Sequence, residues 1–174
     1  MLRGELVALR ARLEADVPIL ETELQDDVVA TTRSSGQPWW PTSPGAEASR
    51  YRITEPDDKR ALFSVVELAT DTLAGAAVLS DINTYGRSAR IGLMLRPDFR
   101  GKGLGTDVLR VLCHYAFTVL GLHRVAMDTL ADNHAMIAAA EQAGFTHEGV
   151  LREAAWMLGG FADLVQLGRL ADDS

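Results

Sequence analysis

The fold is decided by the stretch Arg96-Pro-Asp-Phe-Arg-Gly-Lys-Gly-Leu-Gly-Thr-Asp-Val-Leu109. An apolar run at residues 89–95 precedes it and predicts a strand. Apolar residues at helical spacing follow it from Leu104 to Val119, and they predict a helix that packs on a core. The glycine-rich loop between them lets a ligand approach its backbone N–H groups closely. Because a helix N-terminus attracts anions, the stretch predicts a phosphate or pyrophosphate cradle.

Two common phosphate-binding patterns fit this loop poorly. The P-loop pattern G-x-x-x-x-G-K-[ST] is absent, because Lys102 precedes the helix-starting glycines and neither Ser nor Thr follows it. The dinucleotide pattern G-x-G-x-x-G is also missed, since the glycines run G-x-G-x-G. Asp128, placed at the end of the next predicted strand, is the feature that keeps a dinucleotide site as an alternative.

A third interpretation is a resemblance to a known family. Arg100-x-x-Gly103-x-Gly105 matches the [QR]-x-x-G-x-[GA] acetyl-CoA signature of the GNAT N-acetyltransferase superfamily. The wider context resembles its RimJ/RimL branch in order and spacing, through residues 87–103, Tyr115-Ala-Phe, Asn133, Gly144-Phe145 and Glu148-Gly-Val-Leu-Arg152. The resemblance covers residues 6–170. It implies one GNAT domain there, an α/β acyl-CoA N-acyltransferase fold with a mixed, mostly antiparallel central sheet and flanking helices.

The activity implied by the resemblance is acetyl transfer from acetyl-CoA to a primary amine, by direct attack in a ternary complex and without a metal. The acceptor would be a protein N-terminus, a polyamine or an aminated small molecule. Backbone groups of Leu93, Met94 and Leu95 would bind the pantetheine arm. The pyrophosphate would bind at Arg100, Gly101, Lys102, Gly103, Leu104, Gly105 and Thr106. Asn133 would touch the pantetheine arm, although it is equally a good helix N-cap, and the two roles are compatible.

The acid and base positions of the family carry apolar residues in this chain. Met136, Ala140 and Ala155 stand where relatives have Ser, Tyr and Glu. Glu153 and Asp81 are the substitutes we name, with Glu67 and His114 behind them, although each is more simply a solvated surface group. Water-relayed deprotonation also fits. The missing residues motivate an alternative function, a GNAT-like module that binds acyl-CoA and acts as a sensor or partner domain without transferring anything.

Two adjacent tryptophans, Trp39 and Trp40, lie in a loop-like region rich in turn formers, residues 34–45. One interpretation is that they cover the core beneath a long loop, because large aromatic side chains bury much area. The other is an aromatic wall for the acceptor, where a protonated amine would gain a cation–π contact. The sequence favours neither.

Composition bounds the remaining possibilities. The 174 residues are 47% hydrophobic and 24% charged, which suits one globular domain. The net charge of −7 argues against binding of nucleic acid or anionic membranes, and favours cationic acceptors if the acids line a cleft. Cys113 is the only cysteine, and we expect it to be a buried, unreactive thiol. No apolar run reaches membrane-spanning length, so we expect a cytoplasmic protein whose partners are an amine acceptor and, optionally, a second copy in a homodimer.

Periodicity predicts the remaining elements along the chain. Strands are expected at residues 6–9, 61–68, 73–82, 89–95, 124–129, 146–156 and 161–170. Helices are expected at residues 14–24, from 103 onward and at 133–143, with a further one at 43–51, whereas residues 26–43 show no regular pattern. Gly144 is expected to end the helix at 133–143, and Gly159-Gly160 to turn the last two strands.

Overall fold

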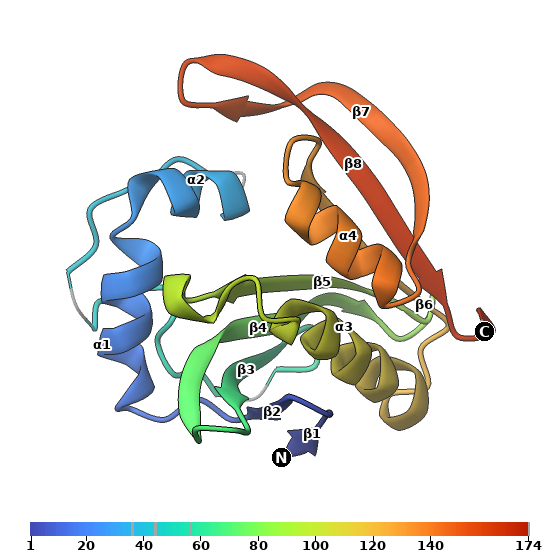
Figure 1. Ribbon diagram of the computed structural model, residues 1–174, viewed down its shortest axis with the longest axis horizontal. Helices are drawn as coiled ribbons and strands as arrows, with labels where there is room; N and C mark the ends of the chain where they lie inside the picture. Colours follow the sequence, from blue (N-terminus) through green and yellow to red (C-terminus); the bar gives the residue numbers. More distant parts are fainter. Residues whose placement is uncertain (36, 44, 56, 174) are drawn as a thin grey trace.

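The computed structural model describes residues 1–35, 37–43, 45–55 and 57–173. One eight-stranded sheet, in the order β1-β2-β3-β4-β5-β6-β8-β7, forms its centre (Figure 1). The strands are β1 (Leu2–Arg3), β2 (Val7–Arg10), β3 (Ala61–Glu67), β4 (Thr72–Asn83), β5 (Ser88–Leu95), β6 (Arg124–Leu130), β7 (Thr146–Met157) and β8 (Gly160–Leu170). Among these described strands only β5 and β6 pair in parallel, so the predicted mixed, mostly antiparallel sheet is confirmed.

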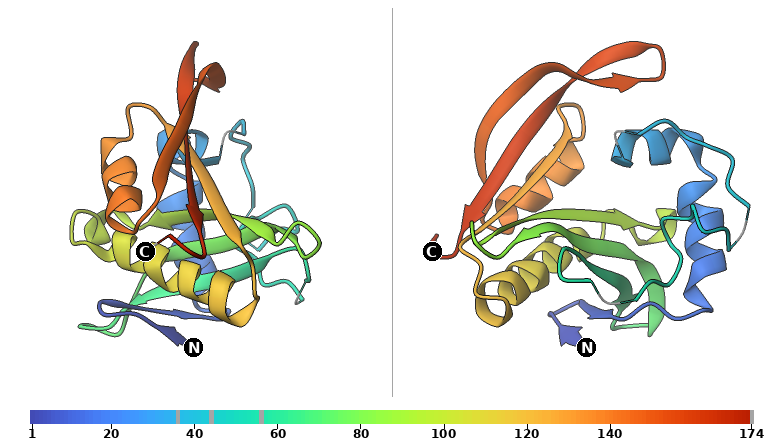
Figure 2. Two further views of the ribbon diagram at one scale, coloured as in Figure 1. Left: turned by 90° about the vertical axis from the view of Figure 1, so that its right-hand side faces the viewer. Right: turned by 180° about the vertical axis from the view of Figure 1, so that it is seen from behind.

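Helical segments flank this sheet. They are α1 (Asp16–Leu20), the π-helical turn η1 (Glu21–Gln25), α2 (Val28–Ser35), the 3-10 turn η2 (Pro97–Phe99), α3 (Leu104–His114), the π-helical turn η3 (Tyr115–Val119) and α4 (His134–Gln142). Helices α3 and α4 lie on one side of β5, while α1 and α2 lie at the far end of the strands (Figures 1 and 2). No helix among the described residues is long and apolar enough to cross a membrane.

The main core lies between α3 and the sheet. Val108, Leu109 and Leu112 are fully buried, as the helical spacing of apolar residues predicts, and they pack with strand residues such as Leu79 and Val125. Complete burial of one such side chain contributes about 1.5–3 kcal/mol, so this face alone fixes α3 against the sheet. The helix N-terminus is thereby held rigidly at the end of β5.

Most predicted elements are confirmed within a few residues, and the exceptions lie near the N-terminus. The helix expected at residues 43–51 is wrong, because the described part of this segment forms turns. Helix α2 was not expected; Asp27 caps it by accepting the Ala30 N–H at 2.9 Å, and the Thr31 hydroxyl donates to the Leu24 carbonyl at 2.6 Å. The turn formers Gly36, Pro44 and Pro56 lie outside the described residues.

Strands β5 and β6 separate soon after they begin. They pair only through residues 88–90 of β5 and 124–126 of β6. Beyond Arg90, β5 keeps β4 as its partner on one edge, while no strand of the described residues pairs with its other edge. Backbone groups on that edge therefore need partners other than a strand, and the Leu95 carbonyl has one in the Arg100 side chain. Asp128 lies inside β6, with Arg90 as its ion-pair partner, and not at a strand end, which removes the feature that favoured a dinucleotide site.

Candidate functional site

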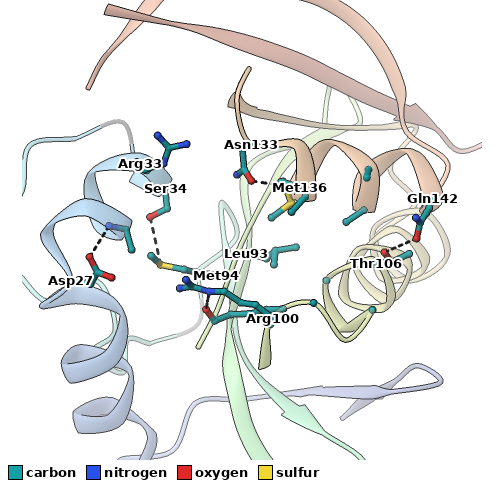
Figure 3. Close-up of a pocket in the computed structure, with 18 of the residues that line it drawn as sticks. Asp27, Arg33, Ser34, Leu93, Met94, Arg100, Thr106, Asn133, Met136 and Gln142 are labelled. Carbon is teal, nitrogen blue, oxygen red and sulfur yellow. Dashed lines mark hydrogen bonds between the residues drawn. The ribbon is translucent and has the colours of Figure 1, made fainter. Parts of the chain in front are cut away.

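A hollow of about 600 Å³, here called the glycine hollow, lies where β5 separates from β6 (Figure 3). Side chains of α2 form one wall and those of α4 the other, with β5 and Arg100 between them. Its lining residues are Asp27, Val29, Ala30, Arg33, Ser34, Leu93, Met94, Leu95, Arg100, Gly101, Gly103, Gly105, Thr106, Asn133, Ala135, Met136, Ala138, Ala139 and Gln142. The structure thus brings together nine of the eleven residues that the sequence assigns to acetyl-CoA.

The N-terminus of α3 opens into this hollow with free donors. The first bond of the helix runs from the Asp107 N–H to the Gly103 carbonyl at 3.3 Å, so the three residues between them have no intrahelical partner for their N–H groups. Gly101 and Gly103 have φ of +72° and +79°, a region that residues with a Cβ rarely adopt. Gly105 has room for a Cβ at ordinary contact distance from Leu95. Packing therefore does not require a glycine at 105, whereas close approach by a ligand would.

The edge of β5 supplies the second set of groups. Past Arg90 no described strand pairs with this edge, and the Arg100 side chain donates from Nε to the Leu95 carbonyl there at 2.9 Å. Arg100 therefore braces the loop against β5. Among the described residues, Lys102 and Leu104 do not line the hollow: the Lys102 ammonium lies 5.2 Å from the Phe99 ring centroid, and the Leu104 side chain is buried in the core.

Asn133 caps α4 at the opposite wall. Its Oδ1 accepts the Met136 N–H at 3.4 Å, and its Nδ2 donates to the Thr129 hydroxyl at 3.0 Å. The N-cap interpretation is confirmed. The residue also lines the glycine hollow, so its contact with a pantetheine arm stays a prediction.

A second hollow of about 500 Å³, here called the arginine hollow, lies on the sheet face opposite α3. Met94 packs there with Leu24 and Tyr51. Ile91 and Leu95 are an odd number of residues away along β5, so they point to the other face of the sheet and pack in the core with α3. Its lining residues are Arg12, Ser34, Glu47, Ala48, Ser49, Arg50, Tyr51, Arg52, Thr54, Arg60, Leu62, Ala76, Ala77, Val78, Ser80, Gly92, Leu93 and Met94. Ser34, Leu93 and Met94 line both hollows, so the two meet at the end of β5.

Tyr51 places a hydroxyl at this boundary. The side chain is buried, and its hydroxyl donates to the Met94 sulfur at 3.4 Å. Burial raises the pKa of Tyr51, against the opposing effect of the nearby Arg50 and Arg12, so the hydroxyl keeps its proton at neutral pH. Sequence reasoning missed Tyr51, because nothing local in the chain distinguishes it from a core aromatic residue.

The residues named as acid and base candidates lie elsewhere. Met136 lines the glycine hollow, whereas Ala140 and Ala155 are buried. Glu153 and Asp81 are exposed, and among the described residues neither lines either hollow. Both have φ near +50°, at irregular points of β7 and β4. Their catalytic roles stay predictions to which this placement adds no support.

The two tryptophans have different surroundings. Trp39 is half-buried and donates its indole N–H to the Gln25 carbonyl at 2.8 Å, whereas Trp40 is 71% exposed. Among the described residues neither tryptophan lines a hollow, but Gln25 accepts a long hydrogen bond, 3.5 Å, from the Ser49 hydroxyl of the arginine hollow. Trp39 therefore supports this hollow from outside.

Cys113 lies on the core side of α3. The thiol is buried, and burial raises its pKa to about 11, against the opposing influence of Arg169. A thiol with a raised pKa is a poor nucleophile. The prediction that Cys113 is buried is confirmed, and its raised pKa supports the expectation that it is unreactive.

The sequence is similar to those of known acetyltransferases. Residues 7–146 match the family described as the acetyltransferase (GNAT) domain. A spermidine N(1)-acetyltransferase of Vibrio cholerae is 31% identical over 103 residues, which is 59% of this chain and 60% of that protein. A putative ribosomal N-acetyltransferase, YdaF of Bacillus subtilis, is 32% identical over 69% of each chain. The chain thus spans only about three-fifths of the first relative's length in alignment.

Solved structures match over nearly the whole chain. The Vibrio cholerae spermidine N-acetyltransferase, crystallised with CoA and spermine, superposes with a TM-score of 0.84 at 23% identity and 98% coverage of both chains. A probable acetyltransferase superposes with a TM-score of 0.79 at 26% identity, covering 98% of this chain and 96% of the other. The predicted GNAT fold is therefore confirmed.

Proposed function

This chain belongs to the GNAT acetyltransferase family, and we propose that it transfers the acetyl group of acetyl-CoA to a primary amine that attacks directly in a ternary complex. The observation that carries the proposal is the meeting of two hollows at Leu93 and Met94. Two reactants held on opposite sides of one boundary react as if at very high local concentration, which supplies about 7–11 kcal/mol of the barrier.

The residues of the glycine hollow fit acetyl-CoA. The free N–H groups at the start of α3, together with the loop from Arg100 to Thr106, suit a pyrophosphate. The unpaired edge of β5 at Leu93–Leu95 suits the amides of a pantetheine arm, and Asn133 faces it across the hollow. Bound there, acetyl-CoA supplies a thioester carbonyl for the amine to attack. A backbone N–H of the β5 edge would polarise that carbonyl.

Proton transfer needs other groups here, because the family's usual acid and base positions carry Met136, Ala140 and Ala155. In our proposal the Tyr51 hydroxyl, which is neutral and lies at the boundary, donates a hydrogen bond or a proton on the side of the departing sulfur. The proton of the attacking amine leaves through water, or through one of the exposed acids that the sequence suggests. Trp39 would act indirectly, by bracing Gln25 beneath the arginine hollow, and Trp40 would border the acceptor's approach.

Several finer expectations belong to the same proposal. We place the chain in the RimJ/RimL-like branch, with residues 6–170 as one GNAT domain in the cytoplasm. The relatives named for spermidine and for ribosomal protein support an amine acceptor without choosing between a polyamine, a protein N-terminus and a small molecule.

A homodimer would bury the apolar tip of the β7–β8 hairpin, where the exposed Trp156 and Phe161 stack edge to face (Figure 1).

Two measurements test the proposal. Acetyl-CoA at about 100 times its dissociation constant should stabilise the protein by about 2.7 kcal/mol, whereas NAD should not. Release of free CoA should then follow when primary amines are added. Binding of acetyl-CoA without CoA release over a broad amine panel would favour the alternative of a sensor or partner module. Stabilisation by NAD alone would contradict the proposal.

A further inference from the structure

Arg12 is a buried cation with poor compensation. Arg12 is only 9% exposed, and its Nε is buried without a hydrogen-bond partner among the described residues. Among the described residues, the two Nη atoms donate only to the carbonyls of Arg50, at 3.5 Å, and Phe63, at 3.3 Å. Hydrogen bonds made by a guanidinium to a well-placed partner are about 2.7–2.9 Å long. No carboxylate among the described residues pairs with Arg12.

Arg10, two residues earlier, shows the contrasting arrangement. Its two Nη atoms donate hydrogen bonds to the two carboxylate oxygens of Asp16, at 2.6 and 2.9 Å. Asp16, the acid within electrostatic reach of Arg12, is thus already engaged, and it also accepts from the Ser64 hydroxyl at 2.8 Å. Burying a charge without a partner is costly, because water no longer solvates it. Burial accordingly lowers the pKa of Arg12, although an arginine keeps its charge at neutral pH.

The surroundings of Arg12 add positive charge. Arg50, Arg52 and Arg60 line the same hollow, and the carboxylate lining it is the exposed Glu47, 3.9 Å from Arg52. Arg50 has no carboxylate partner among the described residues. Arg60 is paired with Asp57 at 3.5 Å, so Arg12 and Arg50 are the cations of this hollow without a described carboxylate partner. In a chain of net charge −7 the hollow is thus locally cationic, with four arginines against one carboxylate among its described lining residues, and it would repel a polyamine.

Arg12 also lies at a useful distance from the point of transfer. Its guanidinium carbon is 5.6 Å from the centroid of the Tyr51 ring, and the hydroxyl of that ring contacts Met94 at the boundary of the two hollows. Arg12 and Met94 therefore both lie close to the Tyr51 side chain, so one small molecule can reach both. Its amine would lie at the boundary and its other end at the guanidinium.

From these observations we propose that the acceptor is an amine that also carries a carboxylate, and that Arg12 is the counter-ion for that carboxylate in the arginine hollow. The planar fork of a guanidinium matches the two oxygens of a carboxylate, and the anion offsets the burial of the charge. Arg50 adds a second, solvent-exposed cation. This inference rests on the proposed acetyl transfer and narrows its acceptor.

Matched acceptor pairs test the inference. We would measure kcat/KM for CoA release with p-aminomethylbenzoate, β-alanine and γ-aminobutyrate, each against its own amide, at equal concentrations of free amine, with spermidine as the cationic comparison. At least one carboxylate should exceed its amide by tenfold or more, and should exceed spermidine. Amides or spermidine matching the carboxylates would overturn the inference and leave acetyl transfer intact. Failure of acetyl-CoA to bind at all would instead count against the proposed function.

Variants assign the preference to Arg12. In Arg12→Gln the carboxylate-to-amide ratio should fall close to one, whereas Arg12→Lys should retain part of it because the charge remains. Arg169→Gln is the matched control: Arg169 also has a buried Nε without a partner and lies over an aromatic ring, but among the described residues it lines neither hollow. Arg50→Gln, at an exposed position, gives a second variant, with an expected threefold loss of the ratio. Equal losses of both acceptors in Arg12→Gln and Arg169→Gln would contradict the inference.

A binding measurement decides the matter if no acceptor of the panel turns over. The melting temperature of the CoA-saturated protein would be followed with p-aminomethylbenzoate and with its amide. Stabilisation by the carboxylate alone, lost in Arg12→Gln and kept in Arg169→Gln, supports the inference. Equal stabilisation by both compounds, or none by either, overturns it.

Discussion

The two hollows differ in how the chain builds them. Most of the glycine hollow comes from two short segments, the end of β5 with the start of α3, and the start of α4, with α2 closing one side. The arginine hollow collects side chains from the segment after β2, the turns near Tyr51 and three strands of the sheet. The first hollow presents mainly backbone donors, and the second presents side-chain cations. A site made of contiguous backbone tolerates sequence change elsewhere, whereas a site made of scattered side chains changes with each of them.

The largest effect that separates the hollows is expected from Gly105→Val. The added methyl groups would enter the glycine hollow without a strained φ, unlike any substitution at Gly103, where φ is +79°. Acetyl-CoA affinity should fall about 100-fold, or about 2.7 kcal/mol, with the unfolding free energy within about 1 kcal/mol of wild type. Isothermal titration and urea unfolding measure the two. Gly149→Val, at an open position in β7, is the control and should bind acetyl-CoA with wild-type affinity. An equal loss of affinity in this control would contradict the assignment of the effect to the glycine hollow.

Asp16 lies within electrostatic reach of Arg12 of the arginine hollow, and Asp16→Asn should destabilise the fold without changing acetyl-CoA binding. Burial raises the pKa of Asp16, but hydrogen bonds from Arg10, Leu13 and Ser64 outweigh it and hold the pKa below its usual 3.8. The carboxylate therefore stabilises the fold above about pH 4, and the contribution disappears as the pH falls through the lowered pKa. At pH 7 the substitution should cost about 2 kcal/mol of unfolding free energy. A cost that stays constant down to pH 3, or a changed acetyl-CoA affinity, would contradict this account.

Tyr51→Phe tests the boundary itself. Removal of the hydroxyl that contacts Met94 should lower kcat about tenfold, or about 1.4 kcal/mol, and leave acetyl-CoA binding unchanged. Stopped-flow detection of free CoA, together with titration of acetyl-CoA, separates the two quantities. Phe63, which packs edge to face on Tyr115 in the core, offers Phe63→Leu as a control for loss of an aromatic residue. An unchanged kcat in Tyr51→Phe would leave the hydroxyl as a packing feature.

The smallest effect is expected where α2 meets the loop before α4. Arg33 of α2 and Asp132, which precedes α4, pair at 2.6 Å, with side chains 37% and 65% exposed. Solvent and salt screen such a pair, so Arg33→Ala should change the unfolding free energy by less than about 0.5 kcal/mol. The dissociation constant of acetyl-CoA should change less than threefold. A tenfold change would instead indicate that α2 must close on the ligand for binding.

The sequence predicts correctly those helices and strands whose buried face is visible in the local spacing of apolar residues. Strand β5, the glycine loop and α3 follow one another in the chain, and their apolar faces meet in one core, so the sequence was sufficient for them. Residues 43–51 failed as a predicted helix because their partners are distant. The Ser49 hydroxyl donates to Gln25, and the Gly45 N–H donates to Glu21, and no local pattern contains those contacts.

The sequence by itself determined the free N–H groups at the start of α3, the N-cap at Asn133 and the buried state of Cys113, since each follows from a local sequence pattern. Only the tertiary structure decided where the charges lie. Arg12 and Arg50 are far apart in the sequence, and the sheet and the turns after η1 bring them to one hollow. Net charge is a sum over the chain, whereas a ligand responds to the few charges within a screening length of about 8–10 Å.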